Sequence, residues 1–224
     1  MNKFSFIEAL QHGRPQTLVV YGTSLSQHLA PILRDALAQN FGDKISVINA
    51  GLPAKASRSG LQQLDSRVLQ QPVNALLLEF GINDAFTYDN YSDDTLDKGI
   101  SIAESKANLE AMVDRVQQAQ PQCEIVLQTM NPAYDSAHNE DLAGTRRPHL
   151  ADFYSNYRRV AMARGLKLID HAAMWEELKR RDLTRFETLI PDGVHPTPLA
   201  LRSVVVPFML RVLGVNSPLS HSRA

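Results

Sequence analysis

The sequence predicts an α/β fold in which a parallel sheet is covered by helices on both faces. Short apolar runs recur along the chain, bounded by turn-forming residues, and amphipathic segments of helical length stand between them. The third run, ALLLEF at residues 75–80, is apolar almost throughout, which is typical of a strand buried on both sides. Strands that alternate with helices pair in parallel, because a helical crossover returns the chain to the same edge of the sheet.

The first half of the chain supplies three of the expected strands. Residues 17–21 (TLVVY) form the first, and residues 27–40 the helix after it. In that helix the apolar residues 29, 32, 33, 36 and 37 recur at helical spacing and predict one buried face. Residues 45–49 and 75–80 are the second and third strands, with a helix at residues 60–70 between them.

The second half continues the alternation. A helix is expected at residues 100–119, a strand at 124–129 and, after a loop rich in Pro, Asp and Asn, a helix at 149–164 that Gly165 ends. A fifth strand at residues 166–169 and helices at 172–181 and 199–213 complete the chain. Right-handed crossovers leave few orders for five parallel strands, and we expect a three-layer flavodoxin-like fold.

Length and composition fit one compact domain spanning residues 1–224. The chain is 44% hydrophobic, enough for a substantial core, and contains no internal repeat, low-complexity segment or long linker. Its net charge of −1 comes without a long run of Lys or Arg. We therefore expect neither nucleic acid nor an anionic membrane surface as a partner, and the sequence gives no indication of the oligomeric state.

Cysteine usage and hydropathy indicate the cellular compartment of the protein. The single cysteine, Cys123, excludes an internal disulfide and is expected to be a small buried apolar side chain. Glu8 interrupts the N-terminal apolar stretch that could serve as a signal peptide, and Pro207 and Arg211 interrupt the most apolar late stretch. The expectation is a soluble, cytoplasmic protein without integral membrane contact.

A serine follows the first expected strand in the segment YGTSLS, residues 21–26. At a strand-to-helix turn Ser24 is an excellent N-cap, and a Gly/Thr/Ser loop before a helix could also hold a phosphate. A third interpretation is a nucleophile at the carboxyl edge of the sheet, where open α/β sheets gather functional loops. The G-x-S-x-G elbow of α/β-hydrolases is absent, because Ser26 occupies the place of its second glycine.

Two further strand ends carry groups that could stabilise a negative charge. Gly51 follows the second strand, and a residue without Cβ lets a substrate oxygen approach its N–H, although glycine here could equally mark only a turn. Asn83 follows the third strand in FGIND, residues 80–84, where its amide can donate to a developing oxyanion. Asn in a turn also bonds its own backbone, and Asp84 is expected to brace this loop rather than react.

The segment PDGVHP, residues 191–196, places an acid three residues before a histidine. This spacing could bring Asp192 to the Nδ1 side of His195 and leave Nε2 free as a base. Metal ligation by Asp-x-x-His is the alternative. No second cluster of His, Asp or Glu has metal-site spacing, so no metal is expected.

The blocks YGTSLS, NAG, FGIND and DGVHP resemble those of the SGNH (GDSL-type) hydrolase superfamily, in the same order and over nearly the whole chain. FGIND and DGVHP are the specific pieces. The resemblance implies a serine esterase without a cofactor, with the triad Ser24, Asp192 and His195 and an oxyanion hole formed by Ser24, Gly51 and Asn83. One departure is Thr23, which stands where the family name implies Asp and so removes a carboxylate beside the nucleophile.

The loops after the third and fourth strands are expected to line the substrate. Candidate contacts are Phe86, Tyr88, Tyr91 and Tyr134, whose other interpretation is ordinary loop anchoring. Because no large apolar insertion resembles a lipase lid, we expect a small ester substrate with an acyl group such as acetyl on a polar alcohol. The alternatives are a lysophospholipase or thioesterase acting on longer chains, acyl transfer to an alcohol, and a non-catalytic module that binds phosphate or a nucleotide.

Overall fold

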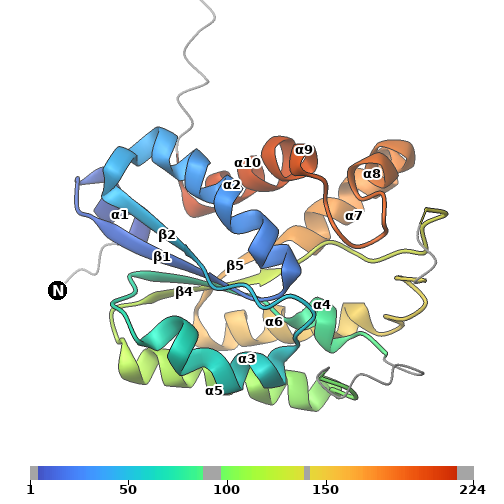
Figure 1. Ribbon diagram of the computed structural model, residues 1–224, viewed down its shortest axis with the longest axis horizontal. Coiled ribbons are helices and arrows are strands. Elements are labelled where there is room, and N and C mark those ends of the chain that lie inside the picture. Colours follow the sequence, from blue (N-terminus) through green and yellow to red (C-terminus); the bar gives the residue numbers. More distant parts are fainter. Residues whose placement is uncertain (1–4, 88–96, 139–141, 216–224) are drawn as a thin grey trace, which may run out of the picture.

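The computed structural model describes residues 5–87, 97–138 and 142–215. Five strands form one sheet in the order β2-β1-β3-β4-β5, and every neighbouring pair is parallel (Figure 1). The strands are β1 (Gln16–Tyr21), β2 (Ile45–Asn49), β3 (Ala75–Leu78), β4 (Glu124–Thr129) and β5 (Lys167–Asp170). This arrangement confirms the predicted flavodoxin-like α/β fold.

Helices cover both faces of the sheet (Figure 1). One layer contains α1 (Phe6–Gln11), α2 (Ser24–Phe41), α7 (His171–Arg181), α8 (Leu183–Leu189) and α10 (Val206–Leu213). The other contains α3 (Ser57–Leu64), α5 (Ile102–Ala119) and α6 (Leu150–Arg164). The described elements also include the short helices α4 (Gly81–Asp84) and α9 (Pro198–Ala200), the 3₁₀ helix η1 (Gly42–Lys44) and the π-helical segments η2 (Asp65–Leu69) and η3 (Leu201–Val205).

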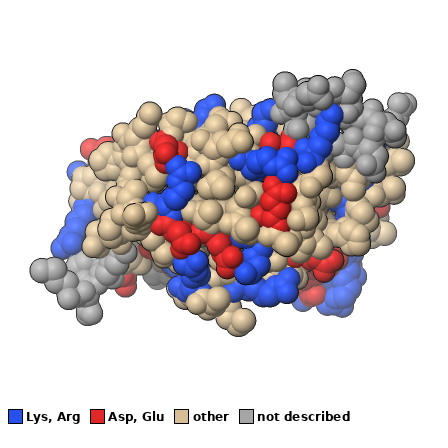
Figure 2. All heavy atoms as spheres, turned by 90° about the horizontal axis from the view of Figure 1, so that it is seen from below, with Lys and Arg blue, Asp and Glu red and all other residues tan. Residues whose placement is uncertain are grey.

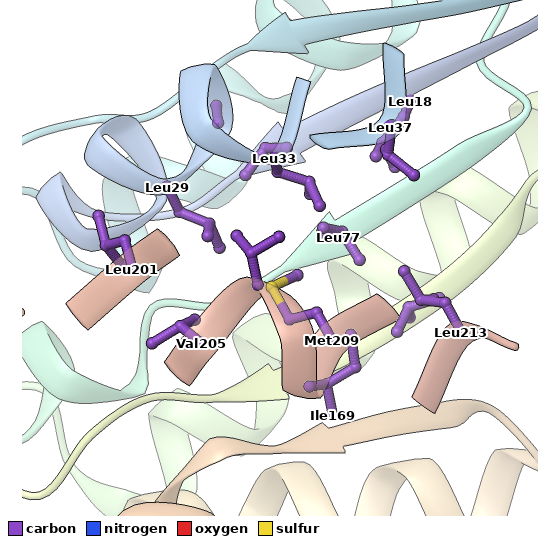
Figure 3. Packing of buried hydrophobic residues seen from close by; sticks show 14 of the residues in the cluster. Leu18, Leu29, Leu33, Leu37, Leu77, Ile169, Leu201, Val205, Met209 and Leu213 are labelled. Atoms are coloured by element: carbon purple, nitrogen blue, oxygen red, sulfur yellow. The ribbon is translucent and has the colours of Figure 1, made fainter. Parts of the chain in front are cut away.

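The core has two halves because successive strand residues point to opposite faces of the sheet. In β1, Leu18 packs with the layer that contains α2, whereas Val19 packs with the layer that contains α5. Figure 3 shows the first half, where α2 lies on the sheet and on the C-terminal helical segment. The labelled side chains there are Leu18, Leu29, Leu33, Leu37, Leu77, Ile169, Leu201, Val205, Met209 and Leu213.

The face formed by α3, α5 and η2 carries both signs of charge side by side (Figure 2). Several of these charges are paired within or between elements. The pairs include Arg58–Glu104, Arg115–Asp65 and Lys106–Glu110. Mixed charge of this kind gives the face no extended field of one sign.

Three described helices were not expected from the sequence, namely the four-residue α4 and the longer α1 and α8. The six-residue α1 offers too few repeats for a periodic signal, and its start is fixed by a capping box in which Ser5 and Glu8 bond each other's backbone N–H. Glu8, which interrupts the apolar N-terminal stretch, is therefore part of a helix start. The seven-residue α8 begins at an Asp182 cap and follows α7 without a turn signal.

Two boundaries near the site also differ from the prediction. Helix α2 begins at Ser24 rather than at residue 27, because the Thr23 hydroxyl caps it by accepting the Leu25 N–H at 3.3 Å. Strand β3 ends at Leu78, and the chain turns into α4 from Gly81. Cys123 is buried, as expected. Within the described residues, no helix combines the length and apolarity needed to cross a membrane.

Candidate active site

The segments singled out by the sequence meet at one edge of the sheet. Ser24 follows β1, Gly51 follows β2 and Asn83 follows β3, so all three lie at the carboxyl ends of neighbouring parallel strands. The loop that carries Asp192 and His195 reaches the same edge from α8, just before α9. The strand order thus brings together Ser24, Gly51 and Asn83, and the loop after α8 adds Asp192 and His195.

A continuous hydrogen-bonded chain joins the serine, the histidine and the aspartate. The Ser24 Oγ lies 2.9 Å from His195 Nε2, and His195 Nδ1 lies 2.7 Å from Asp192 Oδ2. When Nδ1–H donates to the carboxylate, Nε2 is left to accept the serine proton. The arrangement has the geometry of a nucleophile, a base and the acid that orients the base.

The Asp192 turn is held from several sides. Its Oδ1 accepts the N–H groups of Val194 at 2.9 Å and His195 at 2.6 Å. Burial by itself would raise the pKa of Asp192, but the hydrogen bonds from the His195 ring and from these two N–H groups outweigh it and lower the pKa to about 2. The carboxylate is therefore ionised across the physiological pH range.

Asn83 and Asp84, at the end of α4, have different tasks. Asn83 Nδ2 donates to the Lys55 carbonyl at 2.9 Å, and its second hydrogen has no acceptor among the described residues. Asp84 accepts the Ser57 N–H at 2.7 Å and the Ser105 hydroxyl at 2.5 Å. Burial raises the pKa of Asp84 to about 7 against these hydrogen bonds. Asp84 braces the loop, as the sequence predicts.

The loop after β2 presents two backbone N–H groups. The N–H of Gly51, the predicted donor, already donates to Asn49 Oδ1 at 3.1 Å, and a Cβ on Gly51 would collide with Gln27 in α2. The N–H of Ala54 bonds no residue in the described part of the chain. Ala54 has a φ of 58°, a left-handed conformation that is uncommon for a residue with a Cβ.

Two hydrogen bonds join the chain on either side of Ala54 to the site. The Leu52 N–H donates to the Gly22 carbonyl at 2.7 Å, and the Lys55 carbonyl accepts Asn83 Nδ2. Ala54 thus lies between a contact to the nucleophile turn and a contact to Asn83. Sequence reasoning missed it, because alanine carries no signal of a left-handed backbone.

Glu79 is a second residue that the sequence analysis did not single out. It is fully buried beneath the turn that carries Ser24, and its Oε1 accepts hydrogen bonds from Thr23 and Ser26. Burial raises the pKa of Glu79, and these hydrogen bonds oppose the shift. A charged residue inside the apolar run ALLLEF was the signal available.

The sequence pattern of the GDSL-like lipase/acylhydrolase family matches residues 18–201, a stretch that contains the whole hydrogen-bonded chain. The protein belongs to this family. The resemblance noted in the sequence is confirmed, and the protein is a hydrolase acting on carboxylic esters. No curated protein matches this family member by sequence.

Solved structures share the fold of this GDSL-like hydrolase at low sequence identity. A lipase/acylhydrolase from Enterococcus faecalis is 23% identical, with 91% of this chain and 98% of that chain covered and a TM-score of 0.67. Axe2, an acetylxylan esterase from Geobacillus stearothermophilus, is 20% identical, with 91% and 96% covered and a TM-score of 0.70. LAE5, an α/β hydrolase enzyme from the metagenome of Lake Arreo, Spain, is 20% identical, with 91% and 98% covered and a TM-score of 0.72.

A small pocket adjoins the site of this GDSL-like hydrolase. It has a free volume of about 10 Å³ and is flanked by Leu25 and Pro196, the chain neighbours of Ser24 and His195. Its other lining residues are His28, Met130, Asn131, His171, Trp175, Leu201 and Val205. The ring of His28 lies 5.6 Å from the ring of His195, and burial, then the neighbouring His195, lowers the pKa of His28.

The aromatic residues proposed as substrate contacts have mainly structural neighbours. The Tyr134 hydroxyl donates to the Ile190 carbonyl at 2.6 Å, and its N–H donates to the Gly193 carbonyl at 3.1 Å, so Tyr134 anchors the His195 loop. The Phe86 ring lies 4.6 Å from the Arg147 guanidinium carbon. Tyr88 and Tyr91 fall outside the described residues. No group of three or more His, Cys, Asp or Glu with metal-binding geometry occurs in the part of the chain that is described.

Proposed function

We propose that this family member is a serine esterase that removes a small acyl group, acetyl above all, from a polar alcohol through an acyl-enzyme. The observation that carries the proposal is the hydrogen-bonded chain from Ser24 through His195 to Asp192, with distances of 2.9 and 2.7 Å. A serine hydroxyl is a weak nucleophile by itself, and a base in direct contact with it is the arrangement that activates it.

The reaction has two halves. Ser24 Oγ attacks the ester carbonyl while His195 Nε2 takes its proton, and the imidazolium then protonates the departing alcohol. A water molecule repeats the sequence on the acyl-enzyme and releases the acid. Asp192 orients the ring and stabilises the imidazolium without taking the proton, in keeping with the pKa of about 2 that its hydrogen bonds give it.

The tetrahedral intermediate needs donors for its oxyanion. The Ser24 N–H, at the first position of α2, has no acceptor within the helix, and one amide hydrogen of Asn83 has no acceptor in the described part of the chain. The third donor comes from the loop after β2. We assign it to Ala54, whose N–H has no partner in the described chain, rather than to Gly51, whose N–H would first have to leave Asn49.

A solved structure with the same fold supports a small acyl group. The fold neighbour Axe2 is named an acetylxylan esterase, and variants of a serine, an aspartate and a histidine are described as its catalytic mutants. Its aspartate precedes its histidine by three residues, the separation of Asp192 and His195 here.

The test is hydrolysis of p-nitrophenyl esters of increasing acyl length by the wild type and by Ser24→Ala. We expect kcat/KM to be highest for the acetyl ester and to fall as the chain lengthens, with Ser24→Ala inactive and unlabelled by a fluorophosphonate probe. A maximum at long chains would favour the lysophospholipase or thioesterase alternative. Full activity of Ser24→Ala would overturn the proposal altogether.

A further inference from the structure

A buried carboxyl group lies directly beneath the nucleophile turn. Glu79 follows β3 and is 0% exposed. One of its oxygens, Oε1, accepts the Thr23 N–H at 2.6 Å, the Thr23 hydroxyl at 2.8 Å and the Ser26 hydroxyl at 2.8 Å. Thr23 and Ser26 lie on either side of Ser24 in the sequence, so one oxygen atom holds the turn both before and after the nucleophile.

Thr23 passes this constraint on to the helix. Its hydroxyl donates to Glu79 and accepts the Leu25 N–H at 3.3 Å, so the N-cap of α2 is fixed to the sheet through the carboxyl group. The peptide between Thr23 and Ser24 carries the N–H assigned to the oxyanion. Holding Thr23 at both its N–H and its hydroxyl therefore sets the direction of that donor and of the Ser24 Oγ.

Gly22 leaves room for this arrangement. A Cβ at residue 22 would collide with the Glu79 carboxyl group and with the Ser26 hydroxyl. An aspartate at residue 23, which the family name implies, would bring a second carboxylate to a fully buried one. Two carboxylates in such a place cannot both ionise without a large penalty. Thr23 instead supplies two donors to the acid that is already present.

We propose that Glu79 is a positioning residue for Ser24 and that it acts through Thr23. In this chain, where residue 23 is not an acid, the hydrogen-bonded pair of Glu79 and Thr23 fixes the turn that carries Ser24. The inference rests on the proposed function, since it concerns the alignment of the same serine. Glu79 touches neither the substrate nor the reacting atoms. Glu79 instead raises the fraction of molecules in which the Ser24 Oγ and the Ser24 N–H have the reactive geometry.

Thr23→Val and Thr23→Ser form the first test. Valine keeps the shape and removes the hydroxyl, whereas serine keeps the hydroxyl. Active sites are titrated with a fluorophosphonate, so that kcat on p-nitrophenyl acetate is expressed per reactive serine. We expect Thr23→Val to lower this kcat at least about tenfold with KM within about twofold, and Thr23→Ser to restore most of it. An unchanged kcat per titrated site in Thr23→Val would overturn the proposal.

Thr129→Val is the matched control. Thr129 is also fully buried, and its hydroxyl also donates to a carboxylate, Asp170 Oδ1 at 2.8 Å, and accepts the N–H of a helix start, Ala172 at 3.0 Å. Thr23→Val and Thr129→Val therefore remove the same kind of link, a hydroxyl that joins a carboxylate to the start of a helix, at different places in the fold. We expect Thr129→Val to lower the melting temperature but to leave kcat per titrated site unchanged. An equal loss of kcat in both variants would show that the effect is only general destabilisation.

Glu79→Gln and Glu79→Ala give a second test that does not depend on Thr23. Because Oε1 accepts all three hydrogen bonds, a glutamine oxygen in that place can keep them, whereas alanine removes them. We expect Glu79→Gln to retain several times more kcat per titrated site than Glu79→Ala, and equal values would contradict the proposal. Inactivity of the wild type towards every ester would instead refute the proposed function and leave the fold contacts as they are.

Discussion

Among single residues, a backbone N–H without a partner in the described chain separates the proposed oxyanion donor from its supports. Gly51 has the residue type that favours a close approach, but its N–H is engaged by Asn49, and the absence of a side chain is explained by its contact with Gln27. Ala54 has an unfavourable residue type for its φ of 58°, but its N–H has no partner in the part of the chain that the structure describes. A strained conformation that persists is commonly a functional one.

Replacing single backbone amides by esters would separate these two residues. Lactic acid in place of Ala54 removes the N–H and keeps the methyl group, and glycolic acid in place of Gly51 removes the N–H of that residue. We expect the change at residue 54 to lower kcat on p-nitrophenyl acetate roughly 100-fold, the usual effect of losing one oxyanion donor, and the change at residue 51 to have a small effect. The opposite order would return the assignment to Gly51.

The side-chain donor allows a simpler experiment. Asn83→Ala removes the remaining amide hydrogen, and we expect kcat to fall by roughly 100-fold while KM changes little, because the bond forms to the oxyanion and not to the ground-state carbonyl. Steady-state kinetics on the acetyl ester measures both constants. A rise in KM at constant kcat would instead make Asn83 a substrate-binding residue.

Much of the residue-scale picture could be predicted from the sequence, because its residues carry local signals. Asp192 and His195 stand three residues apart across a glycine turn, and Asn83 directly follows an apolar run. Ala54 carries no such signal, and for Glu79 the signal is only that of a charged residue inside an apolar run. The role of Glu79 depends on the distance from β3 to the turn after β1, and that of Ala54 on a backbone conformation set by contacts with Gly22 and Asn83.

At the scale of elements, the loop between α8 and α9 is held in place by a neighbouring loop. Tyr134 donates to Ile190 and Gly193, and Asn131 Nδ2 donates to the Val194 carbonyl at 2.6 Å. These bonds come from the segment after β4, so the position of the histidine depends on an element that carries no catalytic residue. The sequence predicted a functional loop here, but not its partner, because the contacts are mostly to backbone carbonyls.

Gly193 shows how tightly the two loops fit. Its φ is 80°, and a Cβ at this position would collide with the Tyr134 carbonyl oxygen. Gly193→Ala is therefore expected to lose both stability and kcat, since the Asp192–His195 turn must move. Gly165→Ala is the control, because Gly165 has a φ of 60° with open space around it and lies after α6.

The two glycine variants are compared by thermal unfolding and by kcat on the acetyl ester. Gly165→Ala should show only the conformational cost of a left-handed residue, roughly 1–2 kcal/mol, at unchanged kcat. Gly193→Ala should lose more unfolding free energy than that and should lower kcat as well. Equal effects of the two substitutions on both measurements would mean that the contact with Tyr134 does not hold the histidine.

At the scale of the whole molecule, the strand order followed from general rules. Parallel strands with right-handed crossovers allow few arrangements, and the apolar runs located all five strands. The helices α1 and α8 escaped prediction because elements of six and seven residues are too short for a periodic pattern. The two-sided core also buries ionisable groups, so the stability of the whole fold depends on pH.

His171 makes the clearest contribution to that dependence. Its ring is buried at the start of α7, and burial, partly opposed by Asp170, lowers its pKa to about 3, whereas an unfolded histidine has a pKa of about 6.5. Between these values the unfolded chain binds a proton that the folded chain does not. Stability from the neutral ring is thus fully present above about pH 6.5 and is lost as the pH falls towards 3.

His171→Asn should reduce this acid sensitivity. At pH 5 the difference of about 1.5 pH units from the unfolded pKa corresponds to roughly 2 kcal/mol, so the drop in unfolding free energy from pH 7 to pH 5 should be smaller in the variant by about that amount. Urea unfolding at the two pH values measures this difference.

Asp84→Asn is the counterpart of opposite sign. Burial raises the pKa of Asp84 in the folded protein to about 7, so the stabilising proton on Asp84 is lost as the pH rises towards 7. From pH 5 to pH 7, the unfolding free energy of Asp84→Asn should therefore rise relative to that of the wild type. The unfolding free energy of His171→Asn should fall relative to the wild type over the same range. Parallel pH profiles of unfolding free energy for all three proteins would contradict both assignments.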